Sequence, residues 1–342
     1  MGRLFCITPW YYMLYFRKNI IAIVLLIAFS IALMSCTNKD NGNNNPVLPV
    51  DTSDLNLPQV LGKLVYHTYS CYSCNDSRLS LFDFNTKQLI FLSKNWGITN
   101  PMNAHISPDG KKIVFMGIAS GNWDIFTYRL GSVAQPNNLT SNSTARDEDP
   151  KFSPDGSKIV FKRNGILKEM DTTGLVLRTI SVPQSEASMP YYTNNGNGLL
   201  YAGSETGSST LDIFLVSLSG GSTVALSSLP NVEEYYPIAR DDSSFLFTRW
   251  NDQYNQNDQV YMGFYDNKPS IRLPFNQTNS NFSDAFPINE HMVVLSSTKS
   301  GGSGQYDLYI ADIKNGKIWS LSLYNSNVNT SMNELGACYS NK

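Results

Sequence analysis

The chain has 342 residues, of which 42% are hydrophobic and 16% are charged, and its formal net charge at pH 7 is −2. This near-neutral balance provides no basic footprint for nucleic acid, so a nucleic-acid partner is excluded. Gly, Asn, Ser, Tyr and Phe are frequent, and no long stretch has apolar residues at helical spacing. We therefore expect an all-β protein of short strands joined by many turns.

The N-terminus departs from this composition. Arg17 and Lys18 precede an almost wholly apolar stretch, 20–34. This stretch is too short for a comfortable membrane span but has the length of a signal-peptide core behind a basic flank. Met13 would begin a signal of ordinary length, so residues 1–12 are either an extension or a misassigned start. An uncleaved anchor helix is the alternative to a signal peptide.

The apolar stretch ends in Leu33-Met34-Ser35-Cys36, which resembles the lipobox of bacterial lipoproteins. The resemblance implies that 1–35 is a lipoprotein signal peptide and that Cys36 is lipidated and becomes the mature N-terminus. Residues 36–58 have almost no apolar periodicity, which predicts a flexible linker with a reach of roughly 25 Å. We expect the rest of the chain to be exported to the cell envelope and held at the outer membrane by its acyl chains.

A nine-residue pattern, Ser-Pro-Asp-Gly-x-Lys-Ile-Val-Phe, occurs at 107–115 and again at 153–161. It predicts a tight turn followed by a strand. The proline presets φ, the aspartate bonds to its own backbone, and the glycine accepts a left-handed conformation. Two copies of such a pattern in one chain indicate a repeat architecture.

Six related units can be aligned on one position of this pattern. The aligned residues are Ala104, Pro150, Pro190, Pro237, Pro287 and Ala337. They are roughly 40 to 50 residues apart, which is the length of a four-stranded propeller blade. Several units also contain a later strand of the form Asp-Ile-Phe or Asp-Leu-Tyr, as at 124–126, 212–214 and 307–309.

The ends of the repeat region predict how the ring closes. The first unit, 62–66, begins at what should be a second strand, whereas 333–340 match the first strand of the third unit and then stop. The C-terminal strand should therefore complete the first blade and remove the open edges of the sheet. We predict a six-bladed β-propeller over 59–342.

The repeated pattern and the following Asp-Ile-Phe strand resemble the TolB-type β-propeller repeat over roughly residues 62–340. The turns at 193–196, 240–243 and 289–290 depart from the full pattern. TolB itself has an α/β domain ahead of its propeller, where this chain has the predicted linker. The resemblance implies a fold and a style of binding but no reaction.

Two of the five cysteines, Cys71 and Cys74, form a Cys-x-x-Cys motif. The motif lies in a loop between two predicted strands, whereas a thioredoxin-like site needs a helix there. A small structural disulfide in an oxidising compartment is the favoured interpretation. A bridge from either residue to Cys338 stays open, although the expected register places Cys338 several residues away. A zinc site would need more ligands than this region offers.

The three histidines are His67, His105 and His291. Some TolB-like propellers are lyases of pectate fragments with a histidine-bound metal, but the alignment does not bring these three onto one face. We expect structural histidines and no metal or other cofactor. A serine hydrolase of the prolyl-oligopeptidase type needs a Gly-x-Ser-x-Gly elbow and an α/β-hydrolase domain, and the sequence provides neither.

One column of the alignment is acidic. It contains Asp147, Glu234, Asp284 and Glu334. Loops expected on the same face bring three aromatic residues, Trp123, Trp250 and Tyr254. Carboxylates and amphipathic aromatic rings around a channel mouth suit a basic peptide, a cation or a sugar. The alternative is that each carboxylate bonds the backbone of a neighbouring blade.

The favoured function is a non-catalytic binding module, anchored to the membrane through its N-terminal lipid, for an envelope protein, peptide or glycan. The alternative is a lyase or hydrolase of polysaccharide fragments acting at the same channel mouth. Glycosidase chemistry needs two carboxyl groups about 5 to 9 Å apart in distinct roles, and no pair stands out in the sequence.

Overall fold

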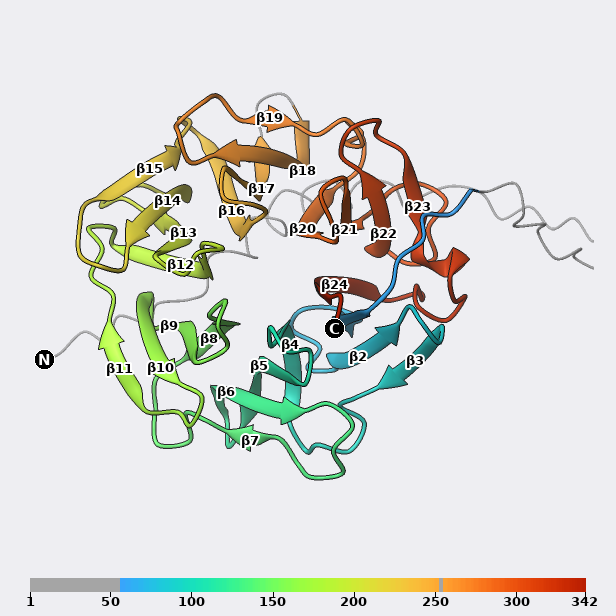
Figure 1. Ribbon diagram of the computed structural model, residues 1–342, viewed down its shortest axis with the longest axis horizontal. Coiled ribbons are helices and arrows are strands. Elements are labelled where there is room, and N and C mark those ends of the chain that lie inside the picture. Colours follow the sequence, from blue (N-terminus) through green and yellow to red (C-terminus); the bar gives the residue numbers. More distant parts are fainter. Residues whose placement is uncertain (1–55, 252–254) are drawn as a thin grey trace, which may run out of the picture. The chain divides into compact units, whose positions relative to one another are not determined.

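The computed structural model describes residues 56–251 and 255–342. Six four-stranded antiparallel sheets form the blades of a ring (Figure 1). The predicted signal peptide, the lipidation candidate Cys36 and most of the predicted linker lie outside the described residues. Within the described part of the chain, no helix is long and apolar enough to cross a membrane. The all-β, six-bladed propeller predicted from the repeats is confirmed.

Each blade runs from an innermost strand beside the central channel to an outermost strand at the rim (Figure 1). In that order, blade 1 consists of β24 (Asn333–Ser340), β1 (Lys63–Tyr69), β2 (Arg78–Asp83) and β3 (Gln88–Phe91), blade 2 of β4 (Thr99–Ile106), β5 (Lys112–Ala119), β6 (Asn122–Arg129) and β7 (Asn137–Asn138), and blade 3 of β8 (Asp147–Phe152), β9 (Lys158–Arg163), β10 (Ile166–Asp171) and β11 (Val176–Thr179). Blade 4 consists of β12 (Glu186–Tyr192), β13 (Gly198–Ser204), β14 (Asp212–Ser217) and β15 (Thr223–Ser227), blade 5 of β16 (Val232–Ala239), β17 (Ser244–Asn251), β18 (Asn255–Phe264) and β19 (Ile271–Arg272), and blade 6 of β20 (Phe282–Pro287), β21 (Met292–Ser297), β22 (Asp307–Asp312) and β23 (Ile318–Ser320).

The ring closes in blade 1 through the two ends of the described chain. Strand β24 pairs antiparallel with β1, so that Val65 lies opposite Cys338 and Tyr69 opposite Asn333. The Tyr339 hydroxyl also donates to the Leu61 carbonyl at 2.7 Å. The predicted closure by the C-terminal strand is therefore confirmed, and the inner edge of blade 1 is paired.

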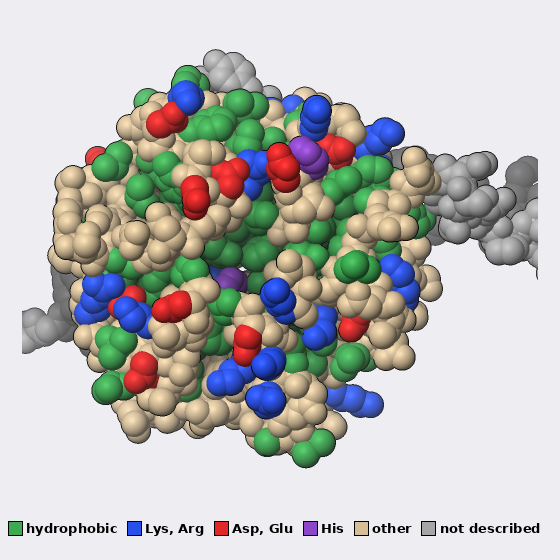
Figure 2. Space-filling view, in the orientation of Figure 1, with side chains coloured by type: hydrophobic (Ala, Val, Ile, Leu, Met, Phe, Trp, Pro, Cys, Tyr) green, Lys and Arg blue, Asp and Glu red, His purple; other side chains and the backbone are tan. Residues whose placement is uncertain are grey.

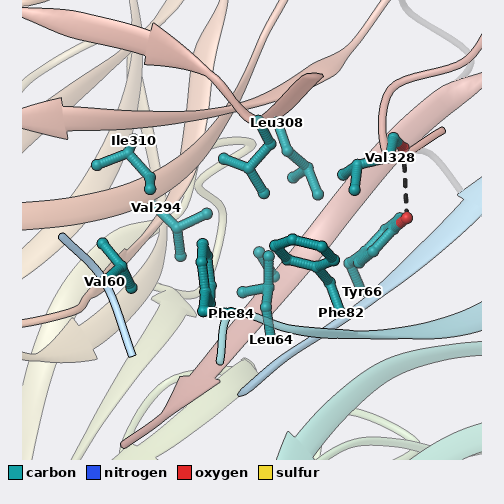
Figure 3. Close-up of a cluster of buried hydrophobic side chains, with 11 residues drawn as sticks. Val60, Leu64, Tyr66, Phe82, Phe84, Val294, Leu308, Ile310 and Val328 are labelled. Atoms are coloured by element: carbon teal, nitrogen blue, oxygen red, sulfur yellow. Dashed lines mark hydrogen bonds between the residues drawn. The ribbon is translucent and has the colours of Figure 1, made fainter. Parts of the chain in front are cut away.

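The hydrophobic core lies between adjacent blades. Where blade 6 meets blade 1, Val294, Leu308 and Ile310 pack against side chains of β1 and β2 (Figure 3). The blade 1 side chains in this cluster include Leu64, Tyr66, Phe82 and Phe84, which are almost fully buried. Because successive side chains of a strand point to opposite faces of its sheet, apolar residues on each face are buried against the neighbouring blade. Burying a large apolar side chain contributes about 1.5 to 3 kcal/mol, which stabilises the contact between blades.

The repeated pattern forms the turn that follows the innermost strand in blades 2 and 3. Ser153 Oγ lies 2.6 Å from Asp155 Oδ1, which also accepts the Ser157 N–H at 2.9 Å. These hydrogen bonds to the charged form lower the pKa of Asp155 to about 2. Gly156 completes the turn at φ +72°, a left-handed conformation that a side chain would strain. The degenerate turn at 193–196 keeps this geometry, with Asn195 in place of the aspartate.

Each innermost strand contains a β-bulge. In every blade the first residue of the bulge has a left-handed backbone. These residues, in blades 1 to 6, are Gly336, Asn103, Asp149, Met189, Tyr236 and Asp284. The residue after Asp284 is Ala285, so Ala285 is equivalent to Ala104 and Pro150. The assignment of Pro287 to that column was wrong, because the sequence alone does not show where the bulge interrupts the pairing of β20 with β21.

Candidate functional site

Three aromatic rings from alternate blades meet in the central channel. His105, Tyr191 and Phe286 each lie two positions after the left-handed bulge residue of blades 2, 4 and 6. Ring centroids are 5.6 Å apart for His105 and Tyr191, and 6.4 Å apart for each of the other two pairs. We call these three residues the aromatic plug. Figure 2 shows a histidine side chain among hydrophobic side chains in the central hollow.

The hydrogen bonds of His105 define its protonation. The Phe152 backbone N–H donates to Nδ1 at 3.1 Å, and Nε2 lies 3.3 Å from the Tyr191 hydroxyl. Nδ1 is therefore an acceptor, and a neutral ring carries its proton on Nε2. Burial, followed by the charge of Lys151, lowers the pKa of His105 to about 3. The ring is neutral at physiological pH and contributes to the structure.

A cavity of about 60 Å³ adjoins the aromatic plug and is lined by all six innermost strands. Lys151 lies in it, and its Nζ donates to the Pro150 carbonyl at 3.3 Å. Burial lowers the pKa of Lys151, whereas Asp149 and Asp284 act against this shift. Asp149 accepts the Asn103 side-chain N–H at 2.9 Å. The cavity is small and has charges of both signs.

Three of the four predicted acids occupy equivalent positions, and all three are fully buried: Asp147, Glu234 and Glu334. Asp147 is held by the Arg163 guanidinium at 2.6 and 2.7 Å. In blade 5 the same arrangement joins Glu234 to Arg249 at 2.7 Å. Glu334 accepts the Thr330 hydroxyl at 2.6 Å. These carboxylates are held inside the fold rather than presented around the channel mouth.

Asp284 does not share this column, because it is the bulge residue of β20. It accepts hydrogen bonds from the Ser283 hydroxyl at 3.0 Å and from the Gly336 N–H at 3.3 Å. Burial raises its pKa. Asp284 lines the central cavity, so the structure separates it from the three acids with which the sequence alignment grouped it.

The sequence analysis missed Asp258, which lies near Asp284. Asp258 accepts hydrogen bonds from the Tyr235 hydroxyl and, at 3.2 Å, from the Tyr306 hydroxyl of blade 6. Burial raises the pKa of Asp258 to about 6, and the charge of Asp284 acts in the same direction. The ring of Tyr236, a residue that lines the central cavity, lies 5.2 Å from that of Tyr235. We call Asp258, Asp284, Tyr235, Tyr236 and Tyr306 the channel-mouth cluster.

A signal for Asp258 exists in the sequence. It occupies the position before the Asp of the Asp-Ile-Phe strand, where other blades have Trp123, Leu211 and Tyr306. An acid at a position that is apolar or aromatic in blades 2, 4 and 6 indicates a special environment, but it does not say which side chains approach from the next blade.

The predicted aromatic residues are only partly brought together with acids. In the strand register, Trp250 of β17 lies opposite Asp258 of β18 and opposite Glu233 of β16. Burial raises the pKa of Glu233 to about 7. Trp123 lies elsewhere, with the Arg146 guanidinium 5.2 Å from its ring centroid. Tyr254 lies outside the described residues.

Cys71 and Cys74 are joined by a disulfide bond, so the structure selects the local pairing among the alternatives that the sequence left open. Cys338 is a buried free thiol in the central channel. The Ile106 N–H donates to its Sγ at 3.3 Å, and burial raises its pKa to about 12. It is therefore a thiol and not a reactive thiolate at neutral pH.

Two of the histidines are buried and the third is exposed. His67, on the second strand of blade 1, is buried and accepts the Asn103 N–H at 3.4 Å, whereas His105 lines the central cavity. His291 is exposed in the turn before β21. Among the described residues, no group of three or more His, Cys, Asp or Glu side chains has a geometry that could hold a metal ion.

No protein-family model matches the chain, and no curated protein matches its sequence. Among solved structures, TolB from Acinetobacter baumannii is similar with a TM-score of 0.63 and 18% identity, over 82% of this chain and 67% of that one. The putative TolB from Agrobacterium tumefaciens has a TM-score of 0.57 and 14% identity, over 76% of this chain and 88% of that one.

Hydrazine synthase from Kuenenia stuttgartiensis is similar with a TM-score of 0.64 and 15% identity, over 82% of this chain. The match spans 46% of the hydrazine synthase chain, so most of that protein has no counterpart here. Identities this low show a shared fold and no shared chemistry. The described chain is a six-bladed β-propeller of the type found in TolB.

Proposed function

We propose that the protein is an exported, lipid-anchored binding module without catalytic activity, and that it binds a basic group of a protein or peptide partner at the channel-mouth cluster. The observation that carries this proposal is the Asp258 carboxylate, which accepts hydrogen bonds from the hydroxyls of Tyr235 and of Tyr306 on the neighbouring blade. Its pKa is raised by burial and also by the charge of Asp284. The export and the lipid anchor rest on the sequence of the N-terminus and on Cys36.

The electrostatics of the cluster favour a cation. Besides burial, the charge of Asp284 acts to raise the pKa of Asp258, so a positive charge placed beside Asp258 offsets this repulsion and stabilises the ionised carboxylate. Tyrosine rings add attraction, because a cation over an aromatic face is worth about 0.5 to 2 kcal/mol. A Lys or Arg side chain supplies both the charge and an apolar stem that can lie along the rings.

Binding should weaken as the pH falls through about 6, because protonation of Asp258 removes the charge that attracts the ligand. A neutral glycan bound at the same cluster would show no such dependence. The pH profile therefore distinguishes a basic partner from an uncharged one.

Fluorescent hexapeptides that contain one Arg or Lys, with Gln-containing peptides as a reference, test the proposal on the full chain in detergent. We expect the basic peptides to bind more tightly, and Asp258→Asn to weaken binding at least about tenfold, since a lost charge-assisted contact is worth about 1.5 to 3 kcal/mol. Glu290→Gln is the matched control, because Glu290 is an exposed acid in a turn. Equal binding of basic and neutral peptides, or unchanged binding by Asp258→Asn, would contradict the proposal.

A further inference from the structure

A second hollow lies where the outermost strand of blade 1, β3, meets the segment that leads from blade 6 into β24. It is an open groove of about 700 Å³. One wall comes from residues 87–91 and the other from 325–330. The walls are joined by a hydrogen bond from the Asn325 side-chain N–H to the Lys87 carbonyl at 2.9 Å. This groove shares no lining residue with the central cavity.

The floor of the groove is apolar. Leu89 and Phe91 lie on the same face of β3, because side chains alternate along a strand. Leu89 packs against the buried cluster between blades 1 and 6. Phe91 continues this apolar surface outwards and is 61% exposed. An aromatic ring at this exposure leaves a flat apolar surface that a ligand can remove from water.

Apart from Lys87, the polar lining of the groove is neutral. Gln88, Ser326 and Asn327 are exposed and bring amides and a hydroxyl. Each of these groups can both donate and accept hydrogen bonds. Lys87 is the one charged residue among those that line the groove, and its ammonium lies 4.8 Å from the centroid of the Tyr324 ring. The groove therefore has no carboxylate with which to hold a basic ligand.

We propose that this groove binds a neutral oligosaccharide. The apolar face of one pyranose ring lies on Phe91, and sugar hydroxyls bond to Gln88, Ser326 and Asn327. Sugar hydroxyls are both donors and acceptors, which matches amide and hydroxyl side chains better than it matches an ionic ligand. The volume falls within the range of about 300 to 1,000 Å³ that is typical of small-molecule sites. The proposal is independent of binding at the channel-mouth cluster.

The test uses the full chain in detergent and five defined probes: cellotriose, maltotriose, laminaritriose, mannotriose and chitotriose. Ligand-observed NMR detects binding, and titration gives the dissociation constant. We expect at least one probe to bind, Phe91→Ala to weaken its binding at least tenfold, and Asn327→Ala to weaken it at least threefold. Phe91→Trp should keep the binding, because it retains an exposed aromatic face.

Leu177→Ala is the matched control, because Leu177 is 46% exposed on the outermost strand of blade 3, far from the groove in sequence. Leu177→Ala should bind the sugar and melt as the unaltered protein does. The melting temperature of Phe91→Ala should also be unchanged, because the ring of Phe91 is exposed. The proposal is overturned if none of the five probes binds at 10 mM, or if Phe91→Ala folds and binds with unchanged affinity. Asp258→Asn should bind the sugar normally, which separates this site from the proposed peptide site.

Discussion

His105 of blade 2 and Tyr191 of blade 4 meet in the central channel, with Nε2 and the hydroxyl oxygen 3.3 Å apart. The contact skips blade 3 and therefore links two blades that are not neighbours in the ring. Phe286 of blade 6 completes the aromatic plug. The centre of the ring is thus packed and hydrogen-bonded.

The aromatic plug should contribute to stability. Tyr191→Phe removes one hydrogen bond and keeps the ring, so we expect a loss of about 1 kcal/mol in the free energy of unfolding. Tyr191→Ala also removes the ring contacts and should cost about 3 to 5 kcal/mol. Urea unfolding monitored by circular dichroism measures both values. Equal stability of the two variants would show that the plug contributes no packing energy.

The pair of Asp147, which is fully buried, and Arg163, which is 22% exposed, should be structural. Asp147→Asn leaves the Arg163 guanidinium without its counter-charge, and we expect a loss of more than about 1 kcal/mol and at most about 3 to 5 kcal/mol, the cost of breaking a fully buried pair. The control is Asp266→Asn, which breaks an exposed pair with Lys268 and should cost less than about 1 kcal/mol. Chemical unfolding of both variants gives the comparison. A negligible loss for Asp147→Asn, with altered peptide binding, would instead support a role of Asp147 in the partner site.

Glu334 should make stability depend on pH. Its pKa is raised by burial from 4.5 to about 7, so the native state binds a proton more tightly than the unfolded state does. Stability should therefore fall as the pH rises from about 4.5 to about 7, by about 3 kcal/mol for this group. Glu334→Gln should remove most of this slope. Free energies of unfolding between pH 5 and pH 8 test it, and an unchanged slope in the variant would contradict the assignment.

The anchor predicted from the sequence has its own test. Cys36→Ser should abolish incorporation of radiolabelled palmitate and release the protein from the membrane fraction, because the acyl chains hold it there. Thr37→Ser, which changes the neighbouring residue conservatively, should behave like the unaltered chain. Continued membrane association of Cys36→Ser without label would favour the uncleaved anchor helix.

Much of the fold can be predicted from local chemistry. The turn at 153–156 depends on hydrogen bonds between residues that are adjacent in the sequence, so the pattern identifies it directly. The β24 closure follows from a missing first strand at one end and a spare one at the other. The acidic column was predicted less well. The sequence alignment put Asp284 at the position equivalent to Asp147, whereas in the structure Asp284 is the bulge residue of β20.

By itself, the sequence determined the repeat, the number of blades and the closure of the ring, because alternation, turn residues and unit length are local properties that every blade repeats. The tertiary structure alone decided which acids are buried in ion pairs, that Tyr306 bonds to Asp258, and that His105 meets Tyr191. The ion pair of Asp147 joins two strands of one blade, whereas the other two contacts join different blades. They depend on where each β-bulge shifts the register and on how six strands pack around one axis, and neither is encoded in any single repeat.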